Sequence, residues 1–67
     1  MELIINGQKR QFSQSALTVA TLLPELGFTN QPVLVELNGR ALFPREFAET
    51  ALHDADRLEM VRLAAGG

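Results

Sequence analysis

The sequence predicts an α+β roll, in which one main helix packs on one face of a mixed sheet of four or five strands. Two Asn-Gly pairs, Asn6-Gly7 and Asn38-Gly39, each lie between segments of strand character, as in tight β-hairpins. Apolar residues at helical spacing lie between the hairpins, and the chain ends in an alternating strand pattern. The expected order of elements is two strands, a helix, two more strands, a short helical turn and a last strand. This order indicates one helix packed over a single sheet.

The first hairpin joins a strand at residues 2–6 to a strand at residues 8–12. Asn-Gly suits a type I′ turn because both of its central residues need positive φ angles. Side chains alternate between the two faces of a strand. We therefore expect Leu3, Ile5 and Phe12 on one face of the sheet.

The main helix is expected to start after Thr18, whose hydroxyl can cap it, and to end at Gly27. Pro24 lies inside this run and lacks an amide donor, so the helix should be bent or regular only in its first turns. Its apolar residues are Val19, Leu22, Leu23 and Leu26.

The second hairpin turns at Asn38-Gly39, after a chain break at Gln31-Pro32. Apolar residues among charges then predict a short helical turn, and the polar run from His53 to Asp56 predicts another turn. The expected ranges are 33–37 and 40–43 for the strands and 44–50 for the helical turn.

The last strand, residues 57–63, alternates between the two faces of the sheet. Leu58 and Met60 are expected to face the core, because they continue the longest apolar set. The opposite face then receives Glu59, Val61 and Leu63.

The composition narrows the classes of function. A chain of 67 residues forms one small domain, and a ligand pocket would remove much of its core, so we expect no self-contained enzyme. The net charge is −2 and the basic residues are scattered, which argues against a nucleic acid partner. Without cysteine there is neither a disulfide nor a thiol nucleophile. His53 beside two aspartates fits a solvated turn, and we expect no metal site.

We also expect a cytoplasmic protein that has no membrane partner. No apolar run approaches the length of a membrane-spanning helix. The N-terminal residues lack the basic region and the cleavage site of a signal peptide.

The chain ends on Gly66-Gly67, which follow two alanines. Glycine has no Cβ, so these residues can enter a narrow channel and bring backbone close to a partner's active site. We expect a domain at residues 1–63 and a flexible tail at residues 64–67, with the carboxylate of Gly67 as the functional group.

Short motifs run through the second half of the chain: Asn38-Gly39, Pro44-Arg45-Glu46, Thr50-Ala51-Leu52, residues 54–61 and Gly66-Gly67. With the order of the elements, they resemble the ThiS family of sulfur carriers in thiamine biosynthesis, which have the β-grasp, ubiquitin-like fold. The chain departs from the family pattern by one apparent extra residue before the Pro-Arg pair. It also has an alanine in the Asp-Ala-Asp turn where the family commonly has glycine, and alanine tolerates positive φ poorly.

The resemblance implies a carrier function for the C-terminus. In the family an E1-like adenylyltransferase (ThiF-like) uses ATP to adenylate this carboxylate, and sulfur from a sulfurtransferase then displaces AMP. The resulting thiocarboxylate, on Gly67 here, donates sulfur to a ThiG-like thiazole synthase. The carrier itself binds no cofactor and performs no catalysis.

A carrier of this kind needs a surface on which its partners dock. The alternation of the last strand places apolar side chains away from the core beside the tail, with Arg57 and Arg62 nearby. Leu34 and Ile4 are further candidates for this surface. The expected partner-binding residues are Glu59, Val61, Leu63, Ala64 and Ala65.

Two alternative functions fit the same sequence. Other β-grasp sulfur carriers, such as the small subunit of molybdopterin synthase and the carriers for cysteine or tRNA thiolation, share the tail chemistry. A ubiquitin-like binding or conjugating module would use Gly67 for an isopeptide bond with lysine, or would not use it chemically.

Overall fold

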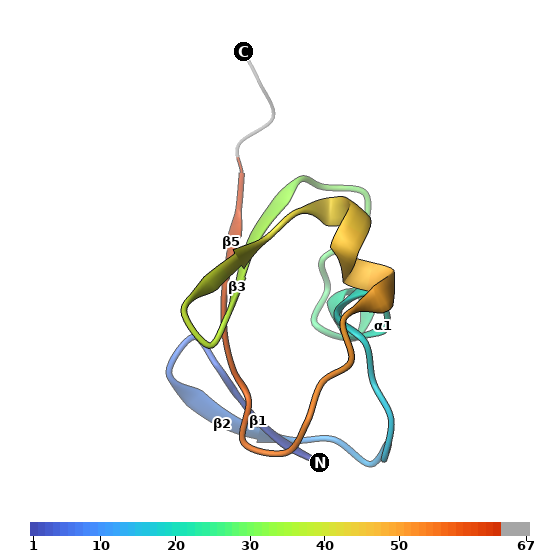
Figure 1. The fold of residues 1–67 in the computed structure, drawn as a ribbon, viewed down its shortest axis with the longest axis vertical. Coiled ribbons are helices and arrows are strands. Elements are labelled where there is room, and N and C mark those ends of the chain that lie inside the picture. Colours follow the sequence, from blue (N-terminus) through green and yellow to red (C-terminus); the bar gives the residue numbers. More distant parts are fainter. Residues whose placement is uncertain (64–67) are drawn as a thin grey trace.

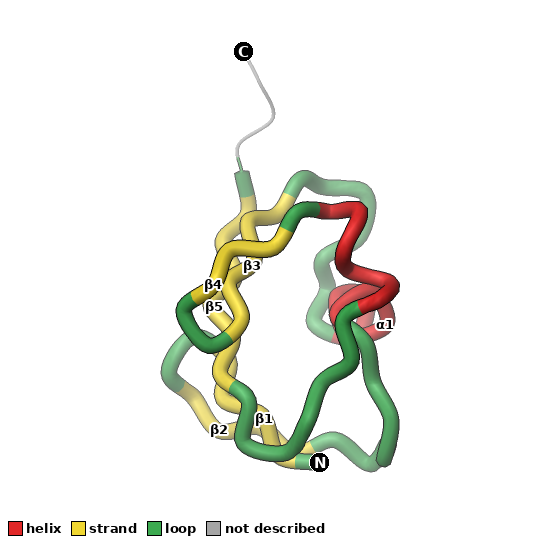
Figure 2. Tube along the Cα trace, viewed as in Figure 1, coloured by secondary structure: helices red, strands yellow, loops and turns green. Residues whose placement is uncertain are grey.

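The computed structural model describes residues 1–63, which form a five-stranded mixed sheet with two helical segments on one side (Figures 1 and 2). The strand order is β2-β1-β5-β3-β4, so the last strand lies at the centre. β1 and β5 are parallel, and the other neighbours are antiparallel. The elements are β1 (Glu2–Ile5), β2 (Gln8–Gln11), α1 (Val19–Glu25), β3 (Val33–Leu37), β4 (Arg40–Leu42), η1 (Pro44–Glu49) and β5 (Arg57–Arg62).

The predicted α+β arrangement and both hairpins are confirmed. The φ angles are +49° and +81° at Asn6-Gly7 and +50° and +85° at Asn38-Gly39, the positive values that a type I′ turn requires. Ile5 lies opposite Gln8 across the first turn. Strands β1, β2, β4 and β5 each end one residue earlier than the sequence pattern suggested, and η1 is a 3₁₀ helix that ends at Glu49.

The two turn asparagines also attach their hairpins to β5. The side-chain Oδ1 of Asn6 accepts a hydrogen bond from the Met60 amide at 2.7 Å, and Nδ2 donates to the Met60 carbonyl at 3.1 Å. Asn38 Oδ1 accepts from the Arg57 amide at 3.0 Å. The β1–β5 ladder is short, and the side-chain amide of Asn6 extends it by another pair of bonds.

Helix α1 begins and ends with its own hydrogen-bonding signals. Thr18 caps it, and the side chains of Thr18 and Thr21 each accept a bond from the other residue's amide. At the other end Gly27, with φ of +86°, donates to the Pro24 carbonyl, and Phe28 donates to the Leu23 carbonyl. The helix therefore stops one residue after Pro24.

The core lies between the sheet and the helical segments (Figure 1). Leu58 and Met60 face it as predicted, and Phe12 and Leu26 pack at its margin, half-buried. Neither helical segment of the described chain has the length and apolar character needed to cross a membrane. The buried residues are Leu3, Ile5, Leu17, Val19, Leu22, Leu23, Val35, Leu42, Phe47, Leu52, Leu58 and Met60.

Candidate functional site

The candidate site starts where β5 leaves the sheet. β5 runs along the middle of the sheet, and its last residues lie at the opposite end of the described chain from the N-terminus (Figure 1). The Leu63 amide donates to the Pro32 carbonyl at 3.0 Å, so pairing continues one residue past the strand. The sequence-predicted tail residues Ala64, Ala65, Gly66 and Gly67 lie outside the described residues.

Four large apolar side chains are exposed in the part of the chain that the structure describes, and all four lie at this end of the sheet. Val61 is 55% exposed and Leu63 is 48% exposed, as the alternation of β5 predicted. Leu34 is 44% exposed and Phe43 is 59% exposed. We call Leu34, Phe43, Val61 and Leu63 the apolar patch.

Strand pairing brings these residues together. Leu34 on β3 lies directly opposite Val61 on β5. Val35 and Leu42 are paired and buried, so Leu34 and Phe43, their neighbours along the chain, are turned to the outer face. The patch therefore crosses three neighbouring strands and ends beside the start of the tail.

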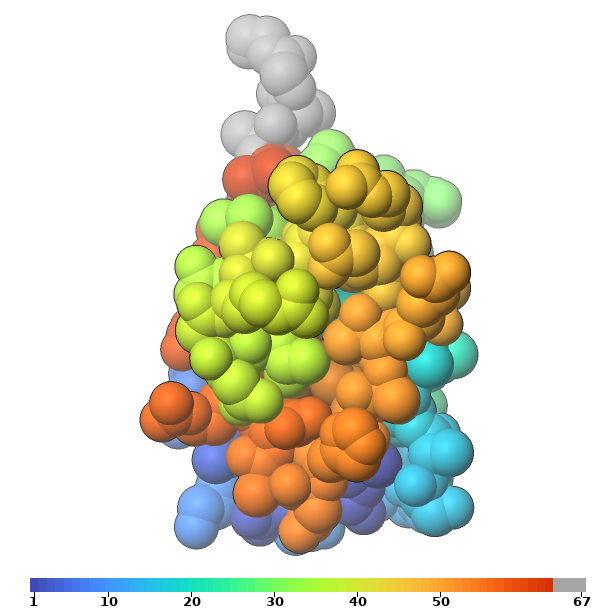
Figure 3. All heavy atoms as spheres, viewed as in Figure 1, coloured from blue at the N-terminus to red at the C-terminus, as the bar shows by residue number. Residues whose placement is uncertain are grey.

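A groove of about 280 Å³ lies within this region. It is lined mainly by apolar side chains, and Figure 3 shows the end of β5 emerging beside the segment that joins β4 to η1. The guanidinium of Arg45 lies 4.7 Å from the centre of the Phe43 ring, at the margin of the groove. The groove-lining residues include Pro32, Leu34, Phe43, Pro44 and Leu63.

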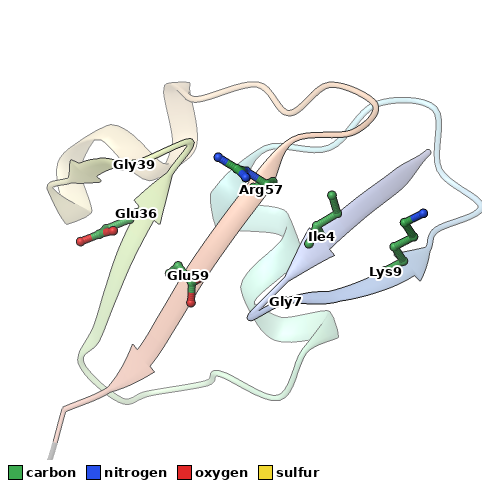
Figure 4. A pocket seen from close by; sticks show the side chains of 7 residues that line it. All are labelled: Ile4, Gly7, Lys9, Glu36, Gly39, Arg57 and Glu59. Carbon is green, nitrogen blue, oxygen red and sulfur yellow. The ribbon is translucent and has the colours of Figure 1, made fainter.

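Phe43 is a patch residue that the sequence analysis missed. The available signal was the alternation of β4, in which Leu42 faces inward and the next residue must face outward. Ile4, a predicted candidate, lies elsewhere. It is half-buried and lines a second groove at the other end of the outer face, together with Arg57 and Glu59 (Figure 4).

Glu59 is exposed on the outer face, two residues before Val61. Its partner across the β3–β5 ladder is Glu36. The predicted partner-binding residues Glu59, Val61 and Leu63 are thus brought to one face of β5, next to acidic and apolar residues of β3.

Arg62, which the sequence analysis placed near the docking surface, lies on the side of β5 that Leu58 and Met60 occupy, as alternation along the strand requires. Its side chain turns toward the helix side, where its guanidinium donates to the Gly27 carbonyl at 3.2 Å. The same group lies 4.6 Å from the centre of the Phe28 ring. Arg62 therefore attaches the end of β5 to the loop that follows α1.

In the turn around His53, aspartate side chains accept hydrogen bonds from backbone amides. Asp54 accepts from the Glu2 amide at 2.7 Å, and Asp56 accepts from the His53 amide at 2.8 Å. The imidazole of His53 is largely exposed and lies 3.8 Å from Asp56. Across residues 1–63, no three His, Asp or Glu side chains converge in a way that could hold a metal ion.

Comparison with known proteins shows the family to which this chain belongs. The family model of ThiS matches residues 3–67, nearly the whole chain. The chain belongs to the ThiS family. Its structure is similar to the crystal structure of a ThiS thiamine biosynthesis protein from Geobacter metallireducens, at 33% identity over the full length of both chains and a TM-score of 0.85. The solution structure of that protein gives a TM-score of 0.82, with all of this chain and 88% of the other covered.

Two further relatives extend the ThiS comparison. A thiazole synthase of Paramagnetospirillum magneticum is 43% identical to this chain over all 67 residues. The chain spans only 20% of the length of that relative. An uncharacterized protein, ycf40, of Porphyra purpurea is 32% identical over 63 residues, which are 94% of this chain and 87% of the relative. The β-grasp fold predicted from the ThiS resemblance is confirmed.

Proposed function

We propose that this ThiS-family chain carries sulfur for thiazole formation in thiamine biosynthesis, as a thiocarboxylate on Gly67. The observation that carries this proposal is the family match, which continues through residue 67 and so includes the Gly66-Gly67 pair. The relative named thiazole synthase supports the pathway, because part of that protein is similar to this whole chain.

The chemistry of the carboxylate explains why separate enzymes are needed. An α-carboxylate is ionised at neutral pH and is therefore a poor electrophile. When its oxygen attacks the α-phosphorus of ATP, pyrophosphate leaves and an acyl adenylate forms. Hydrosulfide, or an equivalent sulfur nucleophile, then attacks the acyl carbon, AMP leaves and a thiocarboxylate remains. In this scheme the chain is a co-substrate, and no side chain of the chain acts as a catalyst.

The apolar patch would supply the affinity that the slim tail lacks. Ordering a tail of small residues costs conformational entropy, and that cost must be offset by contacts made elsewhere. Val61 and Leu63 lie at the start of the tail, so contacts to them would aim the following residues at the partner's active site. In this proposal Ala64 and Ala65 keep the path narrow enough to enter that site.

Three partners follow from the proposed reaction. An E1-like adenylyltransferase consumes ATP, a sulfurtransferase delivers sulfur, and a thiazole synthase receives it. The ATP requirement is consistent with a cytoplasmic location for the carrier. The carrier itself would hold neither ATP nor any other cofactor.

Mass spectrometry of the C-terminal fragment tests the proposal. The chain is incubated with ATP, an adenylating enzyme of this class and sodium sulfide, and then with a thiol alkylator. We expect alkylation on the fragment that contains Gly67 alone, and the absence of cysteine makes this reporter clean. The fragment must be located because exchange of oxygen for sulfur nearly equals methionine oxidation in mass, and Met1 and Met60 can oxidise.

Deletion of Gly66-Gly67 provides the control. The shortened chain should still bind the adenylating enzyme and should form no thiocarboxylate. The proposal is wrong if the intact chain forms neither an adenylate nor a thiocarboxylate while the intact and shortened chains bind the enzyme equally well. The chain would then be a binding module.

A further inference from the structure

The two Asn-Gly turns form a matched pair within one chain. Their φ angles agree closely, at +49° and +81° for Asn6-Gly7 and at +50° and +85° for Asn38-Gly39. Both asparagines are exposed, and a Cβ added to either glycine would meet no atom within 4 Å, so both turns are open to solvent. The clearest difference between the two turns is the set of contacts that holds each asparagine side chain.

Asparagine followed by glycine is the dipeptide in which deamidation is fastest. The glycine nitrogen attacks Cγ of the asparagine, an N–Cγ bond forms, the Cγ–Nδ2 bond breaks, and ammonia leaves with the proton of the glycine amide. Glycine favours this attack because it has no Cβ to hinder the approach. Water then opens the succinimide at either carbonyl carbon and leaves aspartate or isoaspartate. The reaction needs no enzyme, but the asparagine side chain must be free to turn its Cγ toward the next nitrogen.

The side chain of Asn6 is held by the middle of the central strand. It bonds both the amide and the carbonyl of Met60, and these two bonds are partly buried. Met60 itself is buried, and the backbone amide of Asn6 also donates to the Leu58 carbonyl at 2.9 Å. Rotation of the Asn6 side chain would leave backbone groups of a buried residue without these partners, which is costly. Release of Asn6 therefore requires that β1 separate from β5.

The side chain of Asn38 is held at the start of the same strand, where its bonds are exposed. Oδ1 accepts from the Arg57 amide at 3.0 Å, and Nδ2 donates to Oδ1 of Asp56 at 3.0 Å. Arg57 is the first residue of β5 and is exposed, and Asp56 belongs to the turn before it. Water can replace both partners at this position, so fraying of one end of β5 is enough to release Asn38.

We infer that Asn38 is the residue at which the folded chain deamidates, and that β5 protects Asn6 from the same reaction. Since both sites are Asn-Gly, they share their intrinsic reactivity, and the fold sets the difference in rate. Opening at the end of a strand has a low free energy, whereas opening at the centre of a sheet approaches that of global unfolding. The reaction is independent of the proposed sulfur chemistry, because it uses only the turn and water.

Deamidation at residue 38 changes the start of β5. The new carboxylate loses the donor to Asp56 and adds a like charge beside it. Isoaspartate also adds a carbon to the backbone of a two-residue turn whose geometry matches the twist of its strands. The modified chain should therefore have a lower thermal midpoint than the original chain.

Peptide mapping by mass spectrometry tests the inference on the full chain. The chain is incubated at physiological temperature and mildly alkaline pH, with and without urea, and is then digested with trypsin. Cleavage after Lys9 and Arg40 places Asn6 and Asn38 on different peptides, and fragment ions distinguish Asn38 from Asn30. Chromatography separates the aspartate and isoaspartate products, so a rate is obtained for each site.

We expect Asn38 to deamidate about tenfold or more faster than Asn6 in the folded chain. In urea the two rates should become similar, since the fold no longer separates the sites. Asp56→Ala removes the acceptor for Nδ2 of Asn38 and should raise the rate at Asn38 severalfold. The rate at Asn6 is the internal control, because global unfolding of the variant would raise it as well.

Equal rates at the two sites in the folded chain would overturn the inference, since both side chains would then be released by the same unfolding. A faster reaction at Asn6 would overturn it too. So would an unmodified Asn38 in the folded chain over a time in which the chain in urea reacts completely. An Asp56→Ala variant that folds and leaves the rate at Asn38 unchanged would contradict the role of the Asp56 contact. The comparison within the original chain decides the inference even where this variant unfolds.

Discussion

At the scale of single residues, the backbone conformation of the turns depends on which side chain tolerates a positive φ. Three of the four described non-glycine residues with positive φ are asparagines, namely Asn6, Asn30 and Asn38. The fourth is Ala55, with φ of +71°. Its Cβ approaches a backbone carbonyl oxygen in this conformation, so the Asp-Ala-Asp turn is strained. The turn is retained because the Ala55 amide donates to the Glu2 carbonyl at 2.7 Å.

We predict that Ala55→Gly stabilises the protein. Removal of the Cβ relieves the strain, and the gain exceeds the entropy that glycine adds to the unfolded chain, leaving about 0.5–1 kcal/mol. Thermal unfolding should show a midpoint higher by about 2–8 °C. Ala41→Gly, in β4 at ordinary φ, is the matched control and should lower the midpoint. A lower midpoint for Ala55→Gly would show that the turn is not strained.

Asn6 is predicted to contribute through both atoms of its side-chain amide. Asn6→Asp keeps the acceptor for the Met60 amide, but it loses the donor to the Met60 carbonyl and sets two oxygens against each other. The free energy of unfolding at neutral pH should fall by about 1–2 kcal/mol, measured by urea denaturation. Asn30→Asp makes the same change at another positive φ, in the loop before β3, and should have a much smaller effect. Equal effects would mean that only the backbone conformation matters.

At the scale of elements, β5 is attached to both layers of the molecule at its C-terminal end. Its neighbour β3 holds it through the bond from the Leu63 amide to the Pro32 carbonyl. Arg62 holds it to the loop after α1 through the Gly27 carbonyl and the Phe28 ring. The direction in which the chain leaves the sheet is therefore set by contacts on two sides.

We predict that Arg62→Met loosens this end of β5. Methionine keeps an apolar stem over Phe28, but it loses the hydrogen bond to Gly27 and the cation–π contact, at a cost of about 1 kcal/mol. Hydrogen exchange at the Leu63 amide should become faster. Arg45→Met removes a similar contact with Phe43 without a carbonyl bond, and should leave this amide unchanged. Equally slow exchange in both variants would argue against a role for Arg62.

At the scale of the whole molecule, the two faces of the sheet differ in the residues that they carry. The inner face and the helical segments hold the core, whereas the outer face carries the apolar patch and the paired residues Glu36 and Glu59. Substitutions on the outer face should therefore change binding more than stability.

Serine substitutions in the patch test this division. Val61→Ser and Phe43→Ser should each weaken binding to the adenylating enzyme about tenfold or more, since apolar contacts at the centre of an interface dominate affinity. The free energy of unfolding should change by less than about 1 kcal/mol, because both side chains are more than half exposed. Calorimetry on the free chain and the complex measures both quantities. A large loss of stability with unchanged affinity would assign the patch to folding.

Prediction from sequence succeeded where the physical signal was local. Asn-Gly turns, the Thr18 cap and the alternation of Leu58 and Met60 each depend on a few consecutive residues. For Arg62, alternation gives the side of the strand, but only the tertiary structure shows that Gly27 and Phe28 lie within reach of its side chain. Phe43 was missed because the patch emerges only when β4, β3 and β5 lie side by side.

The sequence by itself determined the hairpins, the helix start, the buried face of β5 and, through its motifs, the ThiS family. These features arise from local backbone preferences and from periodic burial, which consecutive residues encode. The tertiary structure alone decided that Glu36 lies opposite Glu59, that Leu34 lies opposite Val61 and that Phe43 joins the patch. The reason is that β5 lies between β1 and β3, and its antiparallel pairing with β3 sets a register between distant segments that brings the charges and apolar groups of the candidate docking surface together.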